Sequence, residues 1–333
     1  MNSACSADHF PLSARSSISP GGRDSRRALT RFRSVLGLDG SLALPGCGDG
    51  CAALCFILPV VRLLLAAWLA VCAAATAYAA PKKIYVVTDL EGITGVYQFA
   101  QTREVDTPLA RQAREFFMGD LAAVVRGLRD GGATEILVLD GHGNQAVLPE
   151  LMAPGAKYIT GLPRPETFPA LDGTFAGVVF LGFHAMMGTS NGVLHHTQSS
   201  KTENRYWYNG VESGEIAQCA AVVGHFGLPV ILVTGDEATC REAEKFLGSA
   251  CVTVAVKKGI ARESAMLYPP AETRPKLQTG ARRAMSAIRQ CQPYRVDLPI
   301  QARKEYLVFE GSSEPRRVTK EGTIPDALRL LGF

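Results

Sequence analysis

The sequence predicts an α/β fold in which helices flank a mainly parallel sheet, with a smaller α+β lobe at the C-terminal end. Short apolar runs recur from residue 83 onward, as in strands that are buried on both faces. Segments with helical spacing of apolar residues separate these runs, and such alternation is typical of parallel sheets. The order changes in residues 296–333, where a strand-like piece (EYLVF, 305–309) precedes a short helical piece (PDALRLL, 325–331).

Five apolar runs are the expected strands of the sheet. The first, Lys83–Thr88 (KIYVVT), is continuous and rich in β-branched residues, which favours a strand with no solvent-facing side. The other four have the same character and are residues 135–139 (EILVL), 177–182 (GVVFLG), 229–234 (PVILVT) and 251–256 (CVTVAV).

The first long helix has a clear start and a clear end. Thr107 suits the cap position and Pro108 the first helical position, and apolar residues then recur at helical spacing as far as Asp130. Gly131 and the glycine after it end the helix. Further helices are expected at residues 213–226, 237–247 and 270–290, and the Asn-Gly pair within residues 206–211 predicts a hairpin turn.

The first 79 residues differ in composition from the rest of the chain. They contain no Lys and no Glu, whereas both are common afterwards. Residues 60–75 (VVRLLLAAWLAVCAAA) are apolar, and the small residues Ala77 and Ala79 follow, which is the pattern of a secretory signal cleaved after Ala79. An uncleaved N-terminal anchor is the alternative. We therefore expect an exported protein, in the bacterial periplasm, without stable membrane insertion after signal cleavage.

This pattern suggests four segments. Residues 1–59 are expected to be a disordered leader or the result of a wrongly assigned start, and residues 60–79 the signal peptide. Residues 80–270 are the expected α/β core, and residues 271–333 a helix with the small lobe. Seven of the 35 Lys and Arg and four of the 31 Asp and Glu precede residue 80, so the remainder is nearly balanced in charge. That balance argues against a nucleic-acid partner.

Acids and histidines follow the expected strands at the points where they end. Asp89 and Glu91 follow the first strand, His142 the second, His184 the third and Asp236 the fourth. In open α/β sheets, functional groups gather beyond the carboxyl ends of the strands, so these residues should lie on one rim.

Each of these residues also has an ordinary structural explanation. His142 could be an exposed turn residue, His184 a hydrogen-bonded core histidine and Asp89 a loop cap. Together, however, imidazole and carboxylate form the mixed ligand set of zinc or a similar divalent ion. A cation would offset the repulsion between Asp89 and Glu91, and one carboxylate can bridge two metals in a hydrolytic site.

Three more residues could take part. His195 and His196 are adjacent, so in extended chain at most one of them should face the site. Glu215 opens an expected helix and could reach a metal, although a first-turn carboxylate also interacts well with the helix dipole. His225, near the end of the same helix, is interpreted as a surface cation.

Five motifs in order resemble the zinc D-aminopeptidases of the bacterial dipeptide-transport type: TDLEG, LDGHG, FLGFHA, GVLHH and a Gly-Glu helix start. The resemblance runs from about residue 83 to about residue 270 and weakens in the C-terminal lobe. No single motif is decisive, but five in the same order with similar gaps are specific.

The resemblance implies a zinc metallopeptidase that removes N-terminal D-amino acids from short peptides and assembles into ring-shaped homo-oligomers. It implies two zinc ions per subunit, with Asp89 as the bridge, and a catalytic histidine at His196. Because one extra residue separates His184 from Gly192, His195 is the second choice. The implied metal ligands are Asp89, Glu91, His142, His184 and Glu215. With export, the substrates would be envelope peptides such as cell-wall fragments bearing D-alanine.

Two other classes of protein remain open at this point. DLEGITGV and GDEATC partly resemble the motifs of magnesium-dependent phosphatases of the haloacid dehalogenase type. That pattern needs an Asp four residues after Asp236, where this chain has Cys240, and it leaves the histidines without a role. A non-enzymatic peptide- or metal-binding envelope protein is the other alternative, but a binder needs no histidine beyond its ligands.

Overall fold

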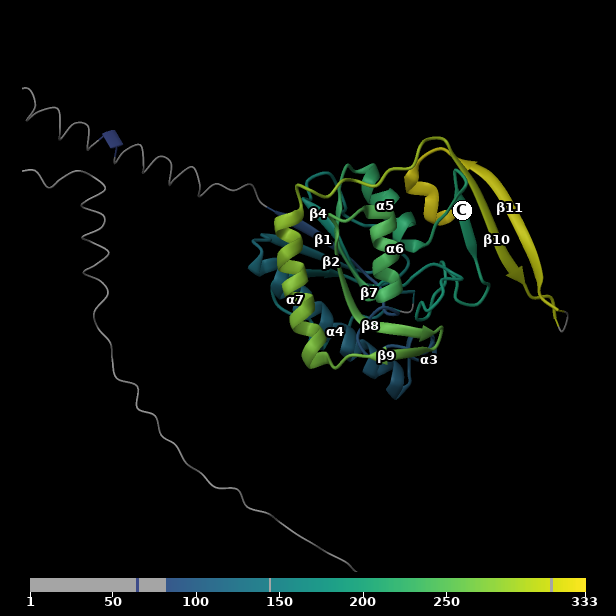
Figure 1. The fold of residues 1–333 in the computed structure, drawn as a ribbon, viewed down its shortest axis with the longest axis horizontal. Helices are drawn as coiled ribbons and strands as arrows, with labels where there is room; N and C mark the ends of the chain where they lie inside the picture. Colours follow the sequence, from purple (N-terminus) through teal and green to yellow (C-terminus); the bar gives the residue numbers. More distant parts are fainter. Residues whose placement is uncertain (1–63, 66–81, 144, 312–313) are drawn as a thin grey trace, which may run out of the picture. The chain divides into compact units, whose positions relative to one another are not determined.

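The computed structural model describes residues 64–65, 82–143, 145–311 and 314–333 (Figure 1). The chain divides into two units, Met1–Ala79 and Ala80–Phe333. The predicted leader and signal segment fall on the first unit and, except for Leu64 and Leu65, lie outside the described residues. Over the part of the chain that is described, no helix is both long and apolar enough to cross a membrane.

A seven-stranded sheet forms the centre of the described part of the second unit, in the order β3-β2-β1-β4-β7-β8-β9. Its pairings are parallel except for the edge pair β8–β9, which confirms the predicted mainly parallel sheet. The strands are β1 (Lys83–Thr88), β2 (Glu135–Asp140), β3 (Lys157–Ile159), β4 (Gly177–Leu181), β7 (Val230–Asp236), β8 (Val252–Ala261) and β9 (Ser264–Leu267). The five predicted strands are all present, whereas β3 and β9 were not expected.

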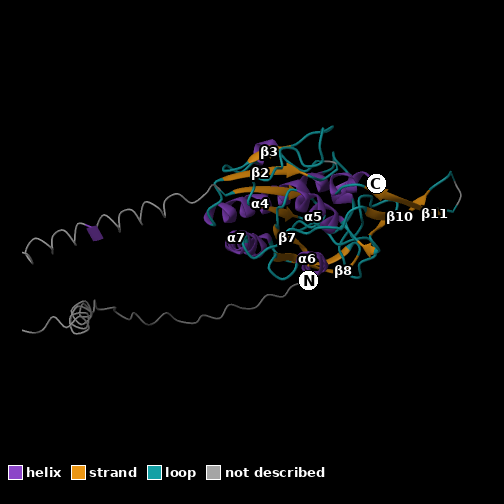
Figure 2. Ribbon diagram, turned by 90° about the horizontal axis from the view of Figure 1, so that it is seen from above, coloured by secondary structure: helices purple, strands orange, loops and turns teal. Residues whose placement is uncertain are grey.

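Helices cover both faces of this sheet (Figure 2). On one face, α4 (Pro108–Asp130) and α7 (Pro270–Ala287) pack together over a cluster that includes the inward side chains of β1, such as Ile84. On the other face, α5 (Glu215–His225) and α6 (Glu237–Leu247) pack together over a second cluster, which includes Tyr85 of β1. As predicted, Thr107 caps α4, and its side chain accepts a hydrogen bond from Ala110 N. The short helices α3 (Ala100–Arg103) and η1 (Pro149–Leu151) lie in loops.

A second, antiparallel sheet has the order β11-β10-β5-β6. Its strands are β5 (Arg205–Tyr208), β6 (Val211–Glu212), β10 (Ile300–Val308) and β11 (Arg316–Ile324), and η2 (Ala327–Gly332) follows. The predicted hairpin turn is present, because Asn209 and Gly210 both have positive φ, 49° and 82°.

The tail differs from its prediction in two ways. It contains two long strands where one short strand was expected, and its final helix is a 3₁₀ helix and not an α-helix. The lobe also takes β5 and β6 from earlier in the chain, so tail residues alone do not build its sheet.

The three central strands end side by side. Thr88, the last residue of β1, is in register with Asp140 of β2 and with Leu181 of β4. Two backbone hydrogen bonds continue this contact beyond the sheet, from Asp89 N to Leu181 O (2.8 Å) and from Gly92 N to Gly182 O (2.7 Å). The segments after β1, β2 and β4 therefore meet at one edge.

Candidate metal centre

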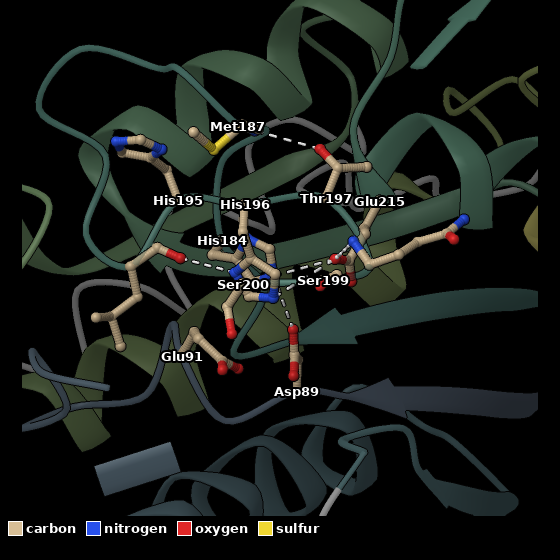
Figure 3. Close-up of polar contacts among 12 residues, drawn as sticks. Asp89, Glu91, His184, Met187, His195, His196, Thr197, Ser199, Ser200 and Glu215 are labelled. Carbon is tan, nitrogen blue, oxygen red and sulfur yellow. Dashed lines mark hydrogen bonds and ion pairs between the residues drawn. The ribbon is translucent and has the colours of Figure 1, made fainter. Parts of the chain in front are cut away.

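The residues predicted from the strand ends come together at this edge of the sheet. Asp89 and Glu91 follow β1, His142 follows β2 and His184 follows β4. Two residues from outside the sheet join them. Glu215 is the first residue of α5, and His196 lies in the loop between β4 and β5 (Figure 3).

Asp89, Glu91 and His142 form the first cluster. His142 Nδ1 lies 3.0 Å from Asp89 Oδ1 and 3.3 Å from Glu91 Oε2. The other ring nitrogen of His142, Nε2, lies 3.0 Å from the carbonyl oxygen of Thr102 and donates to it. A metal-ligating histidine commonly has such a second contact, which fixes the tautomer and turns the free lone pair toward the metal.

His184, His196 and Glu215 form the second cluster. Glu215 Oε1 lies 3.5 Å from His184 Nε2 and 3.9 Å from His196 Nε2. Each imidazole donates from Nδ1 to a backbone carbonyl, at 3.0 Å for His184 and 2.8 Å for His196. The two rings are stacked with centroids 4.0 Å apart. Both Nε2 atoms therefore face the carboxylates.

Asp89 connects the two clusters. Its Oδ1 atom lies 3.0 Å from His142 Nδ1 in the first cluster, and its Oδ2 atom lies 3.4 Å from His184 Nε2 in the second. A carboxylate whose two oxygens face separate ligand groups has the arrangement needed to bridge two ions.

Two buried polar atoms bear on whether these residues suit a metal ion. Among the described residues, Glu91 Oε2 and His184 Nε2 are shielded from solvent and make no hydrogen bond, although His142 Nδ1 lies 3.3 Å from the first atom and Asp89 Oδ2 lies 3.4 Å from the second. Buried polar atoms are rarely left without hydrogen bonds, and a metal ion between them would engage both atoms. Imidazole nitrogens and carboxylate oxygens form the donor set that zinc binds. The residues therefore fit the predicted metal.

Burial and neighbouring charges shift the pKa values of several residues in the two clusters. Burial, reinforced by the neighbouring Glu91 carboxylate, raises the pKa of Asp89 to about 7. Burial opposes the charge of His184, but Glu215 and Asp89 raise its pKa to about 10. Burial and the nearby His184 lower the pKa of His196 to about 4. At neutral pH His196 is therefore a neutral imidazole.

His196, and not His195, reaches the pocket. A pocket of about 590 Å³ is lined by Asp89, Glu91, His142, Glu215 and His196 among others. His195 is not among the lining residues, and its ring points away from His184 and Glu215 (Figure 3). Its Nδ1 atom accepts a hydrogen bond from Gly188 N at 3.1 Å. One histidine of the pair thus faces the site, as the alternation of an extended chain predicts.

Asp236 supports the site from outside the pocket. Its Oδ2 atom accepts from Val193 N (2.6 Å) and thereby holds the loop that carries His196, while its Oδ1 atom caps α6 through Thr239 N (2.7 Å). Both oxygens are therefore occupied. The phosphatase alternative needs acids in this loop to hold magnesium, and here Asp236 is engaged while Cys240 is buried.

Lys257 is a supporting residue that the sequence analysis missed. Its side chain on β8 is fully buried, and its ammonium group donates to the carbonyl oxygens of Glu91, Ile93 and Val96. These bonds curl the segment after β1 so that Glu91 turns inward. A lysine inside an apolar strand was the available signal, but its acceptors are more than 160 residues away along the chain.

His225 and the four cysteines of the described residues lie outside the two clusters. His225 is exposed at the end of α5, as expected for a surface cation. Cys219, Cys240, Cys251 and Cys291 are free and buried. Cys219 lies on α5 and also lines the pocket.

A family model described as D-aminopeptidase matches residues 82–308, which is more than half of the chain. A curated relative named D-aminopeptidase, from Bacillus subtilis (strain 168), is 31% identical over 198 residues, which cover 57% of this chain and 69% of the relative.

A solved structure has the same fold. It is described as the Zn-dependent D-aminopeptidase DppA from Bacillus subtilis, a self-compartmentalizing protease. Its TM-score is 0.67 at 25% sequence identity, and the match covers 75% of this chain and 94% of that one.

Proposed function

The chain belongs to the D-aminopeptidase family and is a zinc metallopeptidase, and from this premise we propose that it releases N-terminal D-amino acids from short peptides with a two-zinc site. The observation that carries the proposal is the position of Asp89, whose two oxygens face separate groups of ligands.

The proposed ligands divide between the two ions. Glu91 and His142 would hold one ion, His184 and Glu215 would hold the other, and Asp89 would contribute a carboxylate oxygen to each. When bound, zinc polarises a carbonyl oxygen and makes a water ligand more acidic. The buried carboxylates and the backbone-tethered imidazoles hold this arrangement in place without rearranging.

His196 is proposed as the catalytic residue. Its Nδ1 hydrogen is engaged by the carbonyl of Leu194, so the Nε2 lone pair is the free end of the ring and faces the pocket. Because its pKa is lowered to about 4, the ring is neutral at pH 7 and can accept a proton or act as a nucleophile. Its 3.9 Å separation from Glu215 also makes it a possible third ligand of that cluster.

Export and assembly are further parts of the proposal. The signal-like residues 60–79 support export to the periplasm, where short peptides bearing D-alanine would be the substrates. The structural neighbour is described as self-compartmentalizing, which supports a homo-oligomer for this chain, and we propose a ring. Analytical ultracentrifugation tests the assembly, and a monomer would contradict it.

The decisive experiment compares hydrolysis of D-Ala-Gly and L-Ala-Gly by the zinc-loaded protein, with a chelator-treated sample as control. Chelator-sensitive cleavage of the D-peptide alone is the expected result. Cleavage of the L-peptide as well would still support a metallopeptidase but would contradict the proposed selectivity for N-terminal D-amino acids. Tight binding of the D-peptide without turnover would favour a binding protein.

A further inference from the structure

The pocket has a second charged feature, which is cationic. Apart from the proposed metal ligands Asp89, Glu91 and Glu215, its described lining contains no carboxylate, but it contains Arg103, Arg164 and Lys201. Once the acids are engaged by metal, the charged groups left to meet a substrate are positive. The part of the substrate that lies away from the metals should therefore carry a negative charge.

Arg164 is the best placed of these cations. It is partly buried, and its Nη1 group donates to the carbonyl oxygen of Asp140 at 2.6 Å. Among the described residues that carbonyl is its one hydrogen-bond acceptor, and no carboxylate pairs with it. The guanidinium is thus fixed at one corner, while its remaining N–H groups have no protein acceptor there.

The other two cations differ from Arg164. Arg103 donates from Nε and Nη2 to Ser200, and its guanidinium lies 3.8 Å from the centroid of the Phe99 ring, so it mainly ties the loop together. Lys201 is exposed on a turn, and a flexible ammonium there positions an anion less well than a tethered guanidinium does.

Arg164 is also attached close to the segment that carries a metal ligand. Asp140, which anchors it, is two residues before the ligand His142, a span of at most about 7 Å. In a dipeptide or tripeptide, the terminal carboxylate lies one or two residues beyond the scissile bond, at about 3.5 Å per residue. A guanidinium is well suited to such a carboxylate because it can donate two parallel hydrogen bonds.

We propose that Arg164 binds the C-terminal carboxylate of the substrate and thereby restricts the enzyme to short peptides with a free C-terminus. This inference rests on the proposed function, because it assigns the far end of the same peptide. It names Arg164 as a specificity-determining residue, and amides or esters of D-amino acids become poor substrates.

The test uses two substrates that differ only in the group at issue, D-Ala-Gly and its C-terminal amide. Arg164→Gln should lower kcat/KM for the acid about 10- to 100-fold, mostly through KM, and change the value for the amide by less than about twofold. Arg164→Lys should recover part of the lost kcat/KM for the acid, because lysine keeps the positive charge but lacks the two parallel N–H donors of a guanidinium. The zinc content of each variant, measured in parallel, should stay equal to that of the wild type.

Arg126→Gln is the matched control, since Arg126 is an exposed arginine on α4 outside the pocket, and it should leave both values unchanged. An equal loss on both substrates, or a loss of zinc, would overturn the inference by showing that Arg164 only supports the His142 turn. The inference would also be overturned if Lys201→Gln, and not Arg164→Gln, lowered kcat/KM for the acid while leaving the amide unchanged. Wild-type protein that cleaves neither substrate would refute the proposed function itself.

Discussion

Replacing Gly92 with alanine should pull apart the two segments that carry the metal ligands. A Cβ atom at this position would lie 1.9 Å from Phe183 O and 2.5 Å from the carbonyl carbon of Gly182. Carbon atoms that are not bonded do not approach so closely, so the backbones after β1 and β4 must separate by about 1 Å or more. Asp89 lies on one side of this contact and His184 on the other.

The expected effects follow from that displacement. Forcing extra volume into a packed site costs about 1–3 kcal/mol of unfolding free energy, or about 2–4 °C in Tm for each kcal/mol in a chain of this size. Zinc ligands tolerate errors of only about 0.2 Å, so zinc affinity should fall more severely than stability. We expect a folded variant that retains less than half of the wild-type zinc after dialysis and has little activity.

Three measurements test this prediction: zinc content by atomic emission, Tm by calorimetry and hydrolysis of D-Ala-Gly. The matched control is Gly173→Ala, because Gly173 is exposed and a Cβ there has its nearest neighbour at 3.8 Å. A Gly92→Ala protein with wild-type zinc content and Tm would refute the reasoning.

Three further substitutions separate the roles of residues around the site. His196→Ala should keep its zinc and lose about 10²- to 10⁴-fold in kcat, whereas a loss of zinc in elemental analysis would make His196 a ligand. Asp89→Asn should weaken zinc at both clusters by at least about 100-fold in a chelator competition, and an effect on one ion alone would contradict bridging. Lys257→Met leaves three buried carbonyls without donors, so urea denaturation should show a loss of about 3–5 kcal/mol, and an unchanged midpoint would contradict this.

The sequence predicted the fold best where a single strand or helix has a regular pattern of apolar residues that are buried. The strands of the parallel sheet have apolar side chains on both faces, and α4 has a capping Thr and a first-position Pro, so each was visible locally. The tail was less predictable. β11 (RRVTKEGTI) is mostly exposed and polar because it forms an edge of the second sheet, and it therefore lacks the apolar alternation that marks a strand.

The site was predictable in outline because strand ends are few and meet at one edge. That argument places Asp89, His142 and His184 together without knowledge of any contact. It could not find Lys257 or Arg164, whose partners are backbone carbonyls on other segments. A carbonyl has no signature in the sequence, so residues that position the site through the main chain became visible only in the structure.

Zinc binding should release protons, because the imidazole ligands are charged when no cation is present. Burial opposes the charge of His142, but the carboxylates of Glu91 and Asp89 raise its pKa well above the usual value, and the pKa of His184 is raised to about 10. Both rings therefore carry a second proton at pH 7 in metal-free protein, and both must lose that second proton to bind zinc. We expect at least two protons released per subunit, two from the imidazoles and a further fraction from Asp89, whose pKa is raised to about 7, and zinc affinity that falls as the pH is lowered. Calorimetric titration of metal-free protein with zinc, in buffers of different ionisation enthalpy, measures this number. A value near zero at pH 7 would show that the imidazoles are already neutral. The carboxylates would then lie farther from the imidazoles than the distances of 3.0 Å (His142 to Asp89) and 3.5 Å (His184 to Glu215) indicate.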